Sequence, residues 1–254
     1  MLVSLQTGWL LLVLLVAVRL GVVFYMTRIF AFAPIPEPVK IIFVLALAVV
    51  LLQAGQFSAP LVEAQPEVVL VGLAAEAVLG LILAFGVQTA LGAYLWGGRI
   101  LDTQMGFGVA NLIDPATQTQ APMIGMLLSL AGLAVFFALD VHHLLLKGLF
   151  VSFEVVPPGQ WLSGFSVPDV TLALSAMFAL GLVMVAPAVV VLLLIDLVVA
   201  FASRTMPQLN AFFLVLPIKI LVGLVVLAVS LNYFGSIHEK IFKSIFYNWL
   251  RLLR

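Results

Sequence analysis

The 254-residue sequence contains no cysteine and few charged residues. Without cysteine the chain can form neither disulfides nor thiolate metal sites, and it has no cysteine nucleophile. Charged residues make up 9% of the chain, with 11 basic and 11 acidic side chains, so the sequence lacks the basic excess that a phosphate-binding surface requires. The composition therefore argues against a nucleic-acid partner and excludes thiol chemistry.

The sequence also lacks the short motifs of common enzymes. It contains no His-Glu-x-x-His metal motif, no Gly-x-Ser-x-Gly nucleophile turn, no phosphate-binding loop and no dinucleotide-binding glycine pattern. No Lys or Arg precedes the first apolar run, which favours an uncleaved anchor helix over a cleaved signal peptide. We therefore predict a protein that is not an enzyme and that has no cofactor.

Apolar residues are abundant in this sequence. They make up 65% of the chain, and the mean hydropathy is +1.30, whereas a soluble domain is roughly half apolar. An aqueous fold of this length could not bury so much apolar surface, so lipid or partner subunits must cover it. Runs such as residues 10–18 do not alternate between apolar and polar residues, which argues against membrane-spanning strands. We predict an all-α membrane protein.

Six apolar stretches predict about six long helical segments: residues 9–33, 39–57, 68–98, 122–153, 168–202 and 211–234. Residues 39–52 are short for a membrane span, which needs about 20 apolar residues, and residues 68–95 are long. We expect the shorter segment to be re-entrant or buried by a partner, and the longer one to be tilted or broken. Pro187 and Pro217 lie within or at the start of apolar stretches, where we expect bent or broken helices.

The C-terminal residues 235–254 differ from the hydrophobic residues 1–234, and we treat them as a separate part of the chain. The apolar side chains of this part recur at helical spacing: Ile241, Ile245, Trp249 and Leu252. With basic residues between them, they predict an amphipathic basic helix. Such a helix can lie on the membrane surface, which we favour, or dock on a partner subunit.

Five of the ionisable residues inside the apolar stretches are of particular interest: Arg19, Glu76, Asp140, Lys147 and Asp196. Each costs roughly 2.5–3.5 kcal/mol at the centre of a bilayer, so each needs a partner. We favour structural pairing, within the chain or with other subunits, over a proton or ion pathway. The pathway hypothesis describes a secondary transporter with four coupling residues: Glu76, Asp140, His143 and Lys147.

Two adjacent histidines follow Asp140. On a helix, Asp140, His143 and Lys147 share one face. However, His142 and His143 would point about 100° apart, and neither a cysteine nor a further histidine lies nearby. We therefore predict no metal site here.

Residues 100–122 form an unusual connection that mixes glycines, amides and large apolar side chains. The segment is too apolar for a free surface loop, so it is either a packed re-entrant connector or a plug. In the plug hypothesis Met105 and Phe107 obstruct a pore, while Gly106 and Gly108 let the loop move.

In their order and spacing, several motifs resemble the FliR family of flagellar biosynthetic proteins and its SctT relatives in injectisomes. They are residues 102–107, Asp114 with Pro115, Pro122, residues 140–143, 152–153, 157–159, 204–210 and 216–219, and the early Arg19 with Pro34. The resemblance covers essentially the whole chain. The family often has glycine where this chain has Asp140.

The resemblance implies a subunit of the type III export gate in the bacterial inner membrane, at the flagellar basal body. It implies assembly with FliP-like and FliQ-like subunits, beside FlhB-like and FlhA-like proteins, around a pore that carries unfolded flagellar proteins outward. Residues 106–122 match the family's plug. The expected plug or gate residues are Met105, Gly106, Phe107, Gly108, Asp114 and Pro115. The charged residues expected to pair or to support assembly are Arg19, Glu76, Asp102, Asp140, Asp196, Arg204 and Lys219.

Overall fold

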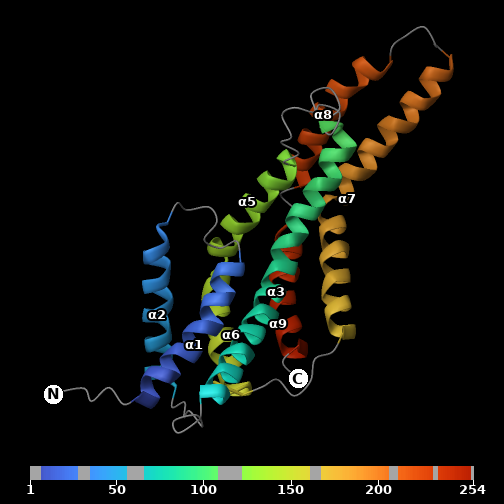
Figure 1. Ribbon diagram of the computed structural model, residues 1–254. Helices are drawn as coiled ribbons and strands as arrows, with labels where there is room; N and C mark the ends of the chain where they lie inside the picture. The colour runs from blue at the N-terminus through green and yellow to red at the C-terminus, as the bar shows by residue number, and fades with distance from the viewer. Residues whose placement is uncertain are drawn as a thin grey trace. The chain divides into compact units, whose positions relative to one another are not determined.

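The computed structural model describes residues 7–27, 35–55, 66–107, 122–160, 167–205, 211–230 and 234–252. These residues form helices and no strands, which confirms the all-α prediction (Figure 1). The helices are α1 (Thr7–Met26), α2 (Glu37–Ala54), α3 (Pro66–Met105), α5 (Met123–Ala138), α6 (Val141–Val155), α7 (Val167–Thr205), α8 (Ala211–Ser230) and α9 (Gly235–Leu252). Gly108, Asp114 and Pro115 of the expected plug lie outside the described residues.

Four described helices, α1, α2, α3 and α7, are long and apolar enough to cross a membrane. The number rises to six if α5 with α6, and α8 with α9, each count as one bent span. The prediction also had six segments, but its sixth segment ended at residue 234 and excluded α9. α3 and α7 contain 40 and 39 residues. At 1.5 Å per residue each is roughly 60 Å long, about twice the thickness of a bilayer core. Either helix is therefore long enough to extend well beyond a bilayer.

The structure corrects two expectations about where helices are interrupted. The stretch 122–153 is two helices, because the chain leaves the helical path at Leu139 and at Asp140, whose φ is 54°. α3 runs without a break through Glu76 to Met105, so a broken helix is the wrong description of this segment.

The prolines act differently at the helix ends and in the interior. Pro36 precedes α2 and Pro38 lies in its first turn, where a missing amide N–H removes no helical hydrogen bond. α7 continues through Pro187, so the proline does not break it, and Figure 1 shows the helix changing direction along its length. α8 likewise contains Pro217 without a break.

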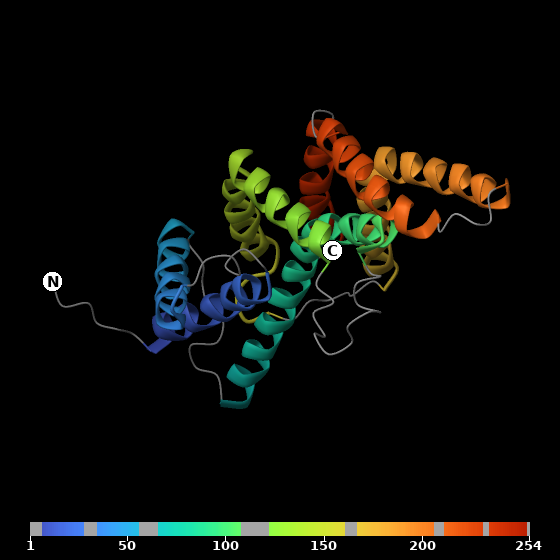
Figure 2. The same ribbon diagram turned by 90° about the horizontal axis from the view of Figure 1, so that it is seen from above.

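Contacts divide the chain into two compact units. The first unit contains residues 1–88, 140–173 and 245–254. It includes α1, α2 and α6, together with parts of α3, α7 and α9. Within it, α1 packs beside α2, and the rings of Phe24 and Phe43 meet edge to face with centroids 5.6 Å apart (Figures 1 and 2).

The second unit contains residues 89–139 and 174–244. Its helices approach one another through glycines. A Cβ at Gly98 of α3 would overlap the backbone of Gly125 on α5, and a Cβ at Gly97 would lie 2.6 Å from the carbonyl oxygen of Gly181 on α7. The absence of side chains at these positions lets the helix backbones come into direct contact.

The apolar face of α9 lies inside the chain. Ile241, Ile245, Trp249 and Leu252 are all at most 3% exposed. In the first unit, the indole N–H of Trp249 donates to the carbonyl oxygen of Leu83 at 2.8 Å. The expectation that this face meets the membrane surface or a partner subunit is therefore wrong, because α3 and other parts of the same chain cover it.

Candidate functional site

Arg19 is the centre of a buried polar cluster in the first unit. Its side chain on α1 has no exposed surface, and Glu76 on α3 is equally buried. Nε of Arg19 donates to Oε2 of Glu76 at 2.6 Å, and Nη2 donates to Oε1 at 3.0 Å. These paired bonds are the two-pronged geometry in which arginine binds carboxylates most strongly. The residues pair with each other within the chain.

The end of α6 satisfies the rest of the guanidinium. Nη1 of Arg19 donates to the carbonyl oxygen of Ser152 at 3.0 Å and to its Oγ at 3.4 Å, and Nη2 donates to the carbonyl oxygen of Val156 at 3.0 Å. The N–H of Gly159 donates to Oε1 of Glu76 at 2.7 Å. Carbonyls at a helix C-terminus favour a cation. The cluster therefore ties α1, α3 and α6 to the turn that follows α6.

Gly80 of α3 lets α1 come close enough for this pairing. A Cβ at Gly80 would lie 2.8 Å from Cβ of Val22 and 2.9 Å from the carbonyl oxygen of Arg19. Gly80 is one turn beyond Glu76 on α3, so the two residues lie on the same side of the helix. The missing side chain at Gly80 thus serves packing within the chain at this point.

In the second unit, Asp102 caps α5 from a neighbouring helix. The carboxylate on α3 accepts the N–H of Ile124 at 2.9 Å and that of Gly125 at 3.0 Å. Pro122, at the start of α5, makes no side-chain capping bond, so these amides take their acceptor from elsewhere. The positive end of the helix dipole also favours the carboxylate. Asp102 therefore holds α3 and α5 together.

The expected plug starts at the end of α3. Met105, the last residue of the helix, is fully buried, and it lies so close to Gly223 of α8 that a side chain at Gly223 would collide with it. Gly106 has a φ of 84°, and its N–H donates to the carbonyl oxygen of Thr103 at 3.2 Å, a conformation that ends a helix. Phe107 follows and is half-buried. The turn therefore has a fixed start against α8.

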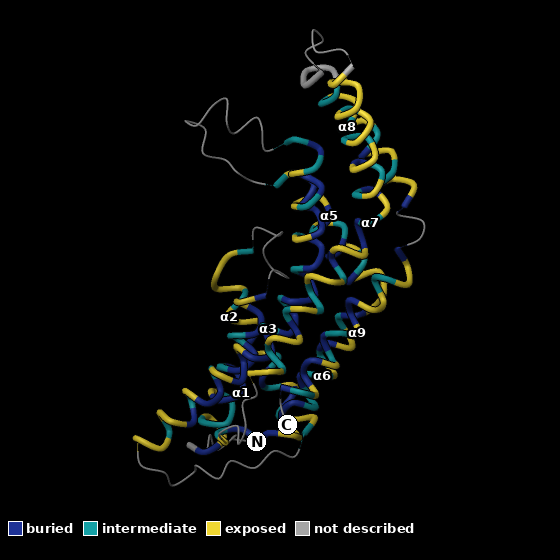
Figure 3. The backbone as a smooth tube through the Cα atoms, turned by 90° about the vertical axis from the view of Figure 1, so that its right-hand side faces the viewer, coloured by how far each residue is buried: buried dark blue, intermediate teal, exposed yellow. Residues whose placement is uncertain are grey.

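Asp196 and Lys219 form a second ion pair, on α7 and α8 of the second unit. Nζ of Lys219 lies 2.6 Å from Oδ1 of Asp196, and the side chains are 15% and 44% exposed, respectively. Figure 3 shows exposed residues along both helices. The exposed apolar neighbours of Asp196 on α7 are Leu193, Leu194, Leu197, Val198 and Phe201. Arg204 is exposed in the last turn of α7.

The transporter hypothesis requires Glu76, Asp140, His143 and Lys147 to act together. Asp140 and His143 are neighbours, with Oδ1 3.6 Å from Nδ1, and Lys147 is exposed further along α6. Glu76 instead uses both carboxylate oxygens within the Arg19 cluster. In the described parts of the chain, no ion pair links Glu76 to the other three residues. The structure does not assemble the four residues into one relay.

Sequence reasoning missed several residues that join helices within the second unit. In the second unit, Oη of Tyr94 lies 2.6 Å from Nδ1 of His238, and the two rings stack. The glycine contacts at Gly97 and Gly98 were also missed. Two adjacent glycines in a long apolar helix are a signal for close packing.

Together, these features define a helical membrane protein with several candidate spans, whose buried charges join helices and helix ends. The family described as "Bacterial export proteins, family 1" matches residues 10–245, and the chain belongs to this family. The chain is 32% identical over 233 residues to the flagellar biosynthetic protein FliR of Bacillus subtilis (strain 168), a match that covers 90% of this chain and 89% of that protein.

Two further relatives are more distant. The flagellar biosynthetic protein FliR of Escherichia coli (strain K12) is 28% identical over 169 residues, 66% of this chain and 65% of that protein. The Yop proteins translocation protein T of Yersinia pestis is 28% identical over 163 residues, 63% of this chain and 62% of that protein. These matches confirm the resemblance found in the sequence. The chain is a membrane component of a flagellar or type III export apparatus.

Proposed function

We propose that this chain is a structural, pore-forming subunit of the flagellar type III export gate in the bacterial inner membrane. It assembles with FliP-like and FliQ-like subunits, beside FlhB-like and FlhA-like proteins, and the resulting pore carries unfolded flagellar proteins outward. Membership of the export family supports this function. The structural observation that carries it is the half-exposed ion pair between Asp196 and Lys219.

This ion pair lies on an apolar surface that lipid alone would cover poorly. α7 contains Asp196, and in the most apolar 18-residue stretch of this helix 22% is buried within the chain. Most of that stretch therefore needs another cover. Ionisable residues in membrane helices face other protein or water-filled space, because contact with lipid is costly for a charge. A partner subunit on this face covers the apolar residues of α7 and provides polar contacts to the carboxylate of Asp196.

The gate is the loop that begins after α3. Met105 fixes the start of the loop against α8, and Gly106 turns the chain away from the helix axis. The sequence assigned the seal to Met105 and Phe107, and the movement to Gly106 and Gly108. Because Met105 is buried against α8, the proposed gate keeps Phe107 as the seal and Gly108 as the hinge. Asp114 and Pro115 belong to the same plug.

Co-expression tests the assembly. The tagged chain is produced with the FliP-like and FliQ-like proteins of its own genome, extracted in mild detergent and examined by native mass spectrometry. We expect one discrete hetero-oligomer that contains all three proteins. A stable monomer or homodimer that binds neither partner would contradict the proposal and favour a transporter.

Leakage tests the gate. We expect Phe107→Ala to increase the passage of small ions through membranes that contain the assembled complex, because the substitution removes the apolar ring from the plug. Phe107→Leu is the matched control, since it keeps most of the apolar volume and should leak less. If both variants and the unmodified complex leak and secrete equally, Phe107 is not part of the seal.

A further inference from the structure

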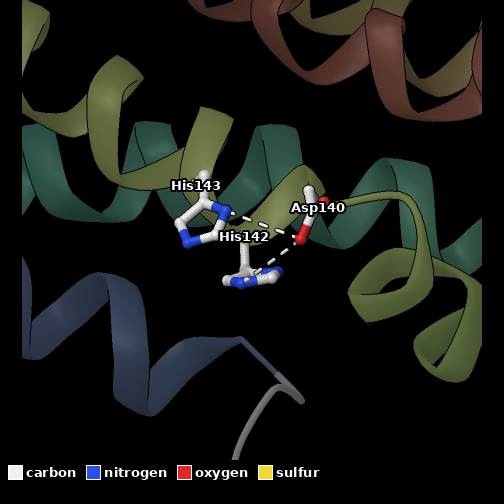
Figure 4. A group of neighbouring side chains, drawn as sticks. All are labelled: Asp140, His142 and His143. Atoms are coloured by element: carbon white, nitrogen blue, oxygen red, sulfur yellow. Dashed lines mark ion pairs between the residues drawn. The ribbon is translucent and has the colours of Figure 1, made fainter.

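A cluster of three potential metal ligands lies at the start of α6, within the first unit. Figure 4 shows the carboxylate of Asp140 beside the imidazoles of His142 and His143. Oδ1 of Asp140 lies 3.6 Å from Nδ1 of His143 and 4.0 Å from Nε2 of His142. One ligand atom from each residue lies within 4.8 Å of the other two.

The structure differs from the expectation that His142 and His143 point about 100° apart on a helix. Instead, the ring centroids of His142 and His143 are 4.1 Å apart, with 39° between the ring planes. The first turn of α6 therefore brings both imidazoles to the same carboxylate.

The backbone at Asp140 affects where its carboxylate lies. Its φ of 54° makes it the one residue other than glycine with a positive φ among the described residues. An aspartate that precedes a helix usually has an extended backbone and caps the first amides, but Asp140 makes no side-chain capping bond. Among residues other than glycine, aspartate and asparagine adopt this conformation most readily, so the turn itself accounts for the positive φ. The carboxylate is directed to the imidazoles instead of to the helix.

The donor set selects a class of metal. Two imidazole nitrogens and one carboxylate oxygen suit Zn²⁺, Co²⁺ or Ni²⁺, whereas Mg²⁺ and Ca²⁺ require a set dominated by oxygen. In a tetrahedral zinc site with bonds of about 2.1 Å, the ligand atoms are about 3.4 Å apart. The side chains of Asp140 and His143 are 74% and 70% exposed, so small rotations can close the remaining gaps.

We infer that Asp140, His142 and His143 form a binding site for one divalent transition-metal ion, with water in the fourth position. The bound ion links the residue at the break before α6 to the first turn of that helix. The site is independent of the proposed export function.

Metal binding to the purified full-length chain tests this inference. The chain is produced with a tag that lacks histidine, stripped with a chelator and dialysed against Zn²⁺, and Co²⁺ absorption reports the coordination geometry. We compare the wild type with Asp140→Gly and His143→Gln. Glycine adopts a positive φ without strain, so Asp140→Gly removes the ligand and keeps the fold. Glu154→Gln, which removes an exposed carboxylate from the same helix, is the matched control.

We expect about one ion per chain in the wild type and in Glu154→Gln, with a tetrahedral Co²⁺ spectrum. Loss of groups that only orient metal ligands weakens affinity 10- to 100-fold, so each ligand variant should bind at least about tenfold more weakly. Zn²⁺ should also raise the melting temperature of the wild type but not that of Asp140→Gly. The absence of saturable binding in the wild type, or equal binding by both ligand variants, would overturn the inference.

Discussion

Two ion pairs between helices, Arg19 with Glu76 and Asp196 with Lys219, differ in how completely this chain satisfies them. In the first unit, Arg19 makes five hydrogen bonds, and neither it nor Glu76 has exposed side-chain surface. In the second unit, Asp196 meets Lys219 through one close contact and stays 44% exposed. A pair that is complete within the chain serves folding. A pair left half-exposed on an apolar surface needs groups from outside the chain.

The largest expected effect concerns the complete pair. Removing one partner of a buried pair leaves an uncompensated charge, which costs about 3–5 kcal/mol. For a chain of this size, that cost lowers the melting temperature by roughly 10 °C. We expect this loss for Arg19→Met and for Glu76→Gln, measured as the temperature at which the detergent-purified chain loses its monodisperse chromatographic peak.

The double variant Arg19→Met/Glu76→Met sharpens this test. It should be more stable than either single variant, because it leaves no unpaired charge. It should remain below the wild type, because the carbonyls of Ser152 and Val156 lose their donors. Leu14→Ala, at a side chain 45% exposed on the same helix, is the control. Single variants as stable as this control would show that the pair does not hold the fold together.

Substitutions of Asp102 should have an intermediate effect on stability. They test whether the two ion pairs differ because the chain satisfies one of them more completely or because they lie in different units. It lies in the second unit but bonds entirely within the chain. Asp102→Ala should cost about 1–2 kcal/mol, the range for a lost helix cap that also carries charge. Asp102→Asn should cost less, because the amide keeps one acceptor. Both are measured by the same melting assay.

The neighbouring Thr103→Ala is the matched control for Asp102, because Thr103 is exposed and its hydroxyl donates to the carbonyl oxygen of Ile100 on the same helix. If Asp102→Ala and Thr103→Ala have the same melting temperature, the carboxylate of Asp102 adds nothing to stability. A polar group that is fully satisfied within the chain would then not stabilise the second unit as the Arg19 cluster is expected to stabilise the first.

The helices themselves could be predicted from the sequence, because long apolar runs have few alternatives in a membrane. The break before α6 could not, since Leu139 and Asp140 continue an apolar stretch and the turn depends on the left-handed conformation of a single aspartate. A break of this kind requires tertiary contacts to stabilise it, and single residues do not reveal them.

The sequence indicated that certain side chains are buried, but it did not indicate which residues they contact. The apolar surroundings of Arg19 and Glu76 indicated that both needed partners, but they lie 57 residues apart and no local pattern joins them. The sequence pattern predicts that Trp249 meets a membrane surface or a partner subunit. It packs against Gly86 and Gly148 instead, where the absence of side chains leaves room for the indole. Neither Trp249 nor the glycines reveal this contact on their own, because the fit between a large and a small residue depends on two segments that are far apart in the sequence.

The smallest effect on the melting temperature of the isolated chain is expected at the pair of Asp196 and Lys219. This prediction decides whether the two ion pairs serve different purposes. A half-exposed ion pair contributes about 0–1 kcal/mol, so Asp196→Leu/Lys219→Leu should hardly change the melting temperature. The same variant should lower the yield of the hetero-oligomer in native mass spectrometry, since a partner loses its polar contacts. Glu239 and Lys243 on α9, an exposed pair also 2.6 Å apart, provide the matched control Glu239→Gln/Lys243→Met, which should affect neither property. If the Asp196 and Lys219 variant instead melts as early as Arg19→Met and assembles normally, its ion pair serves folding, and the exposed surface of α7 and α8 has no need of a partner.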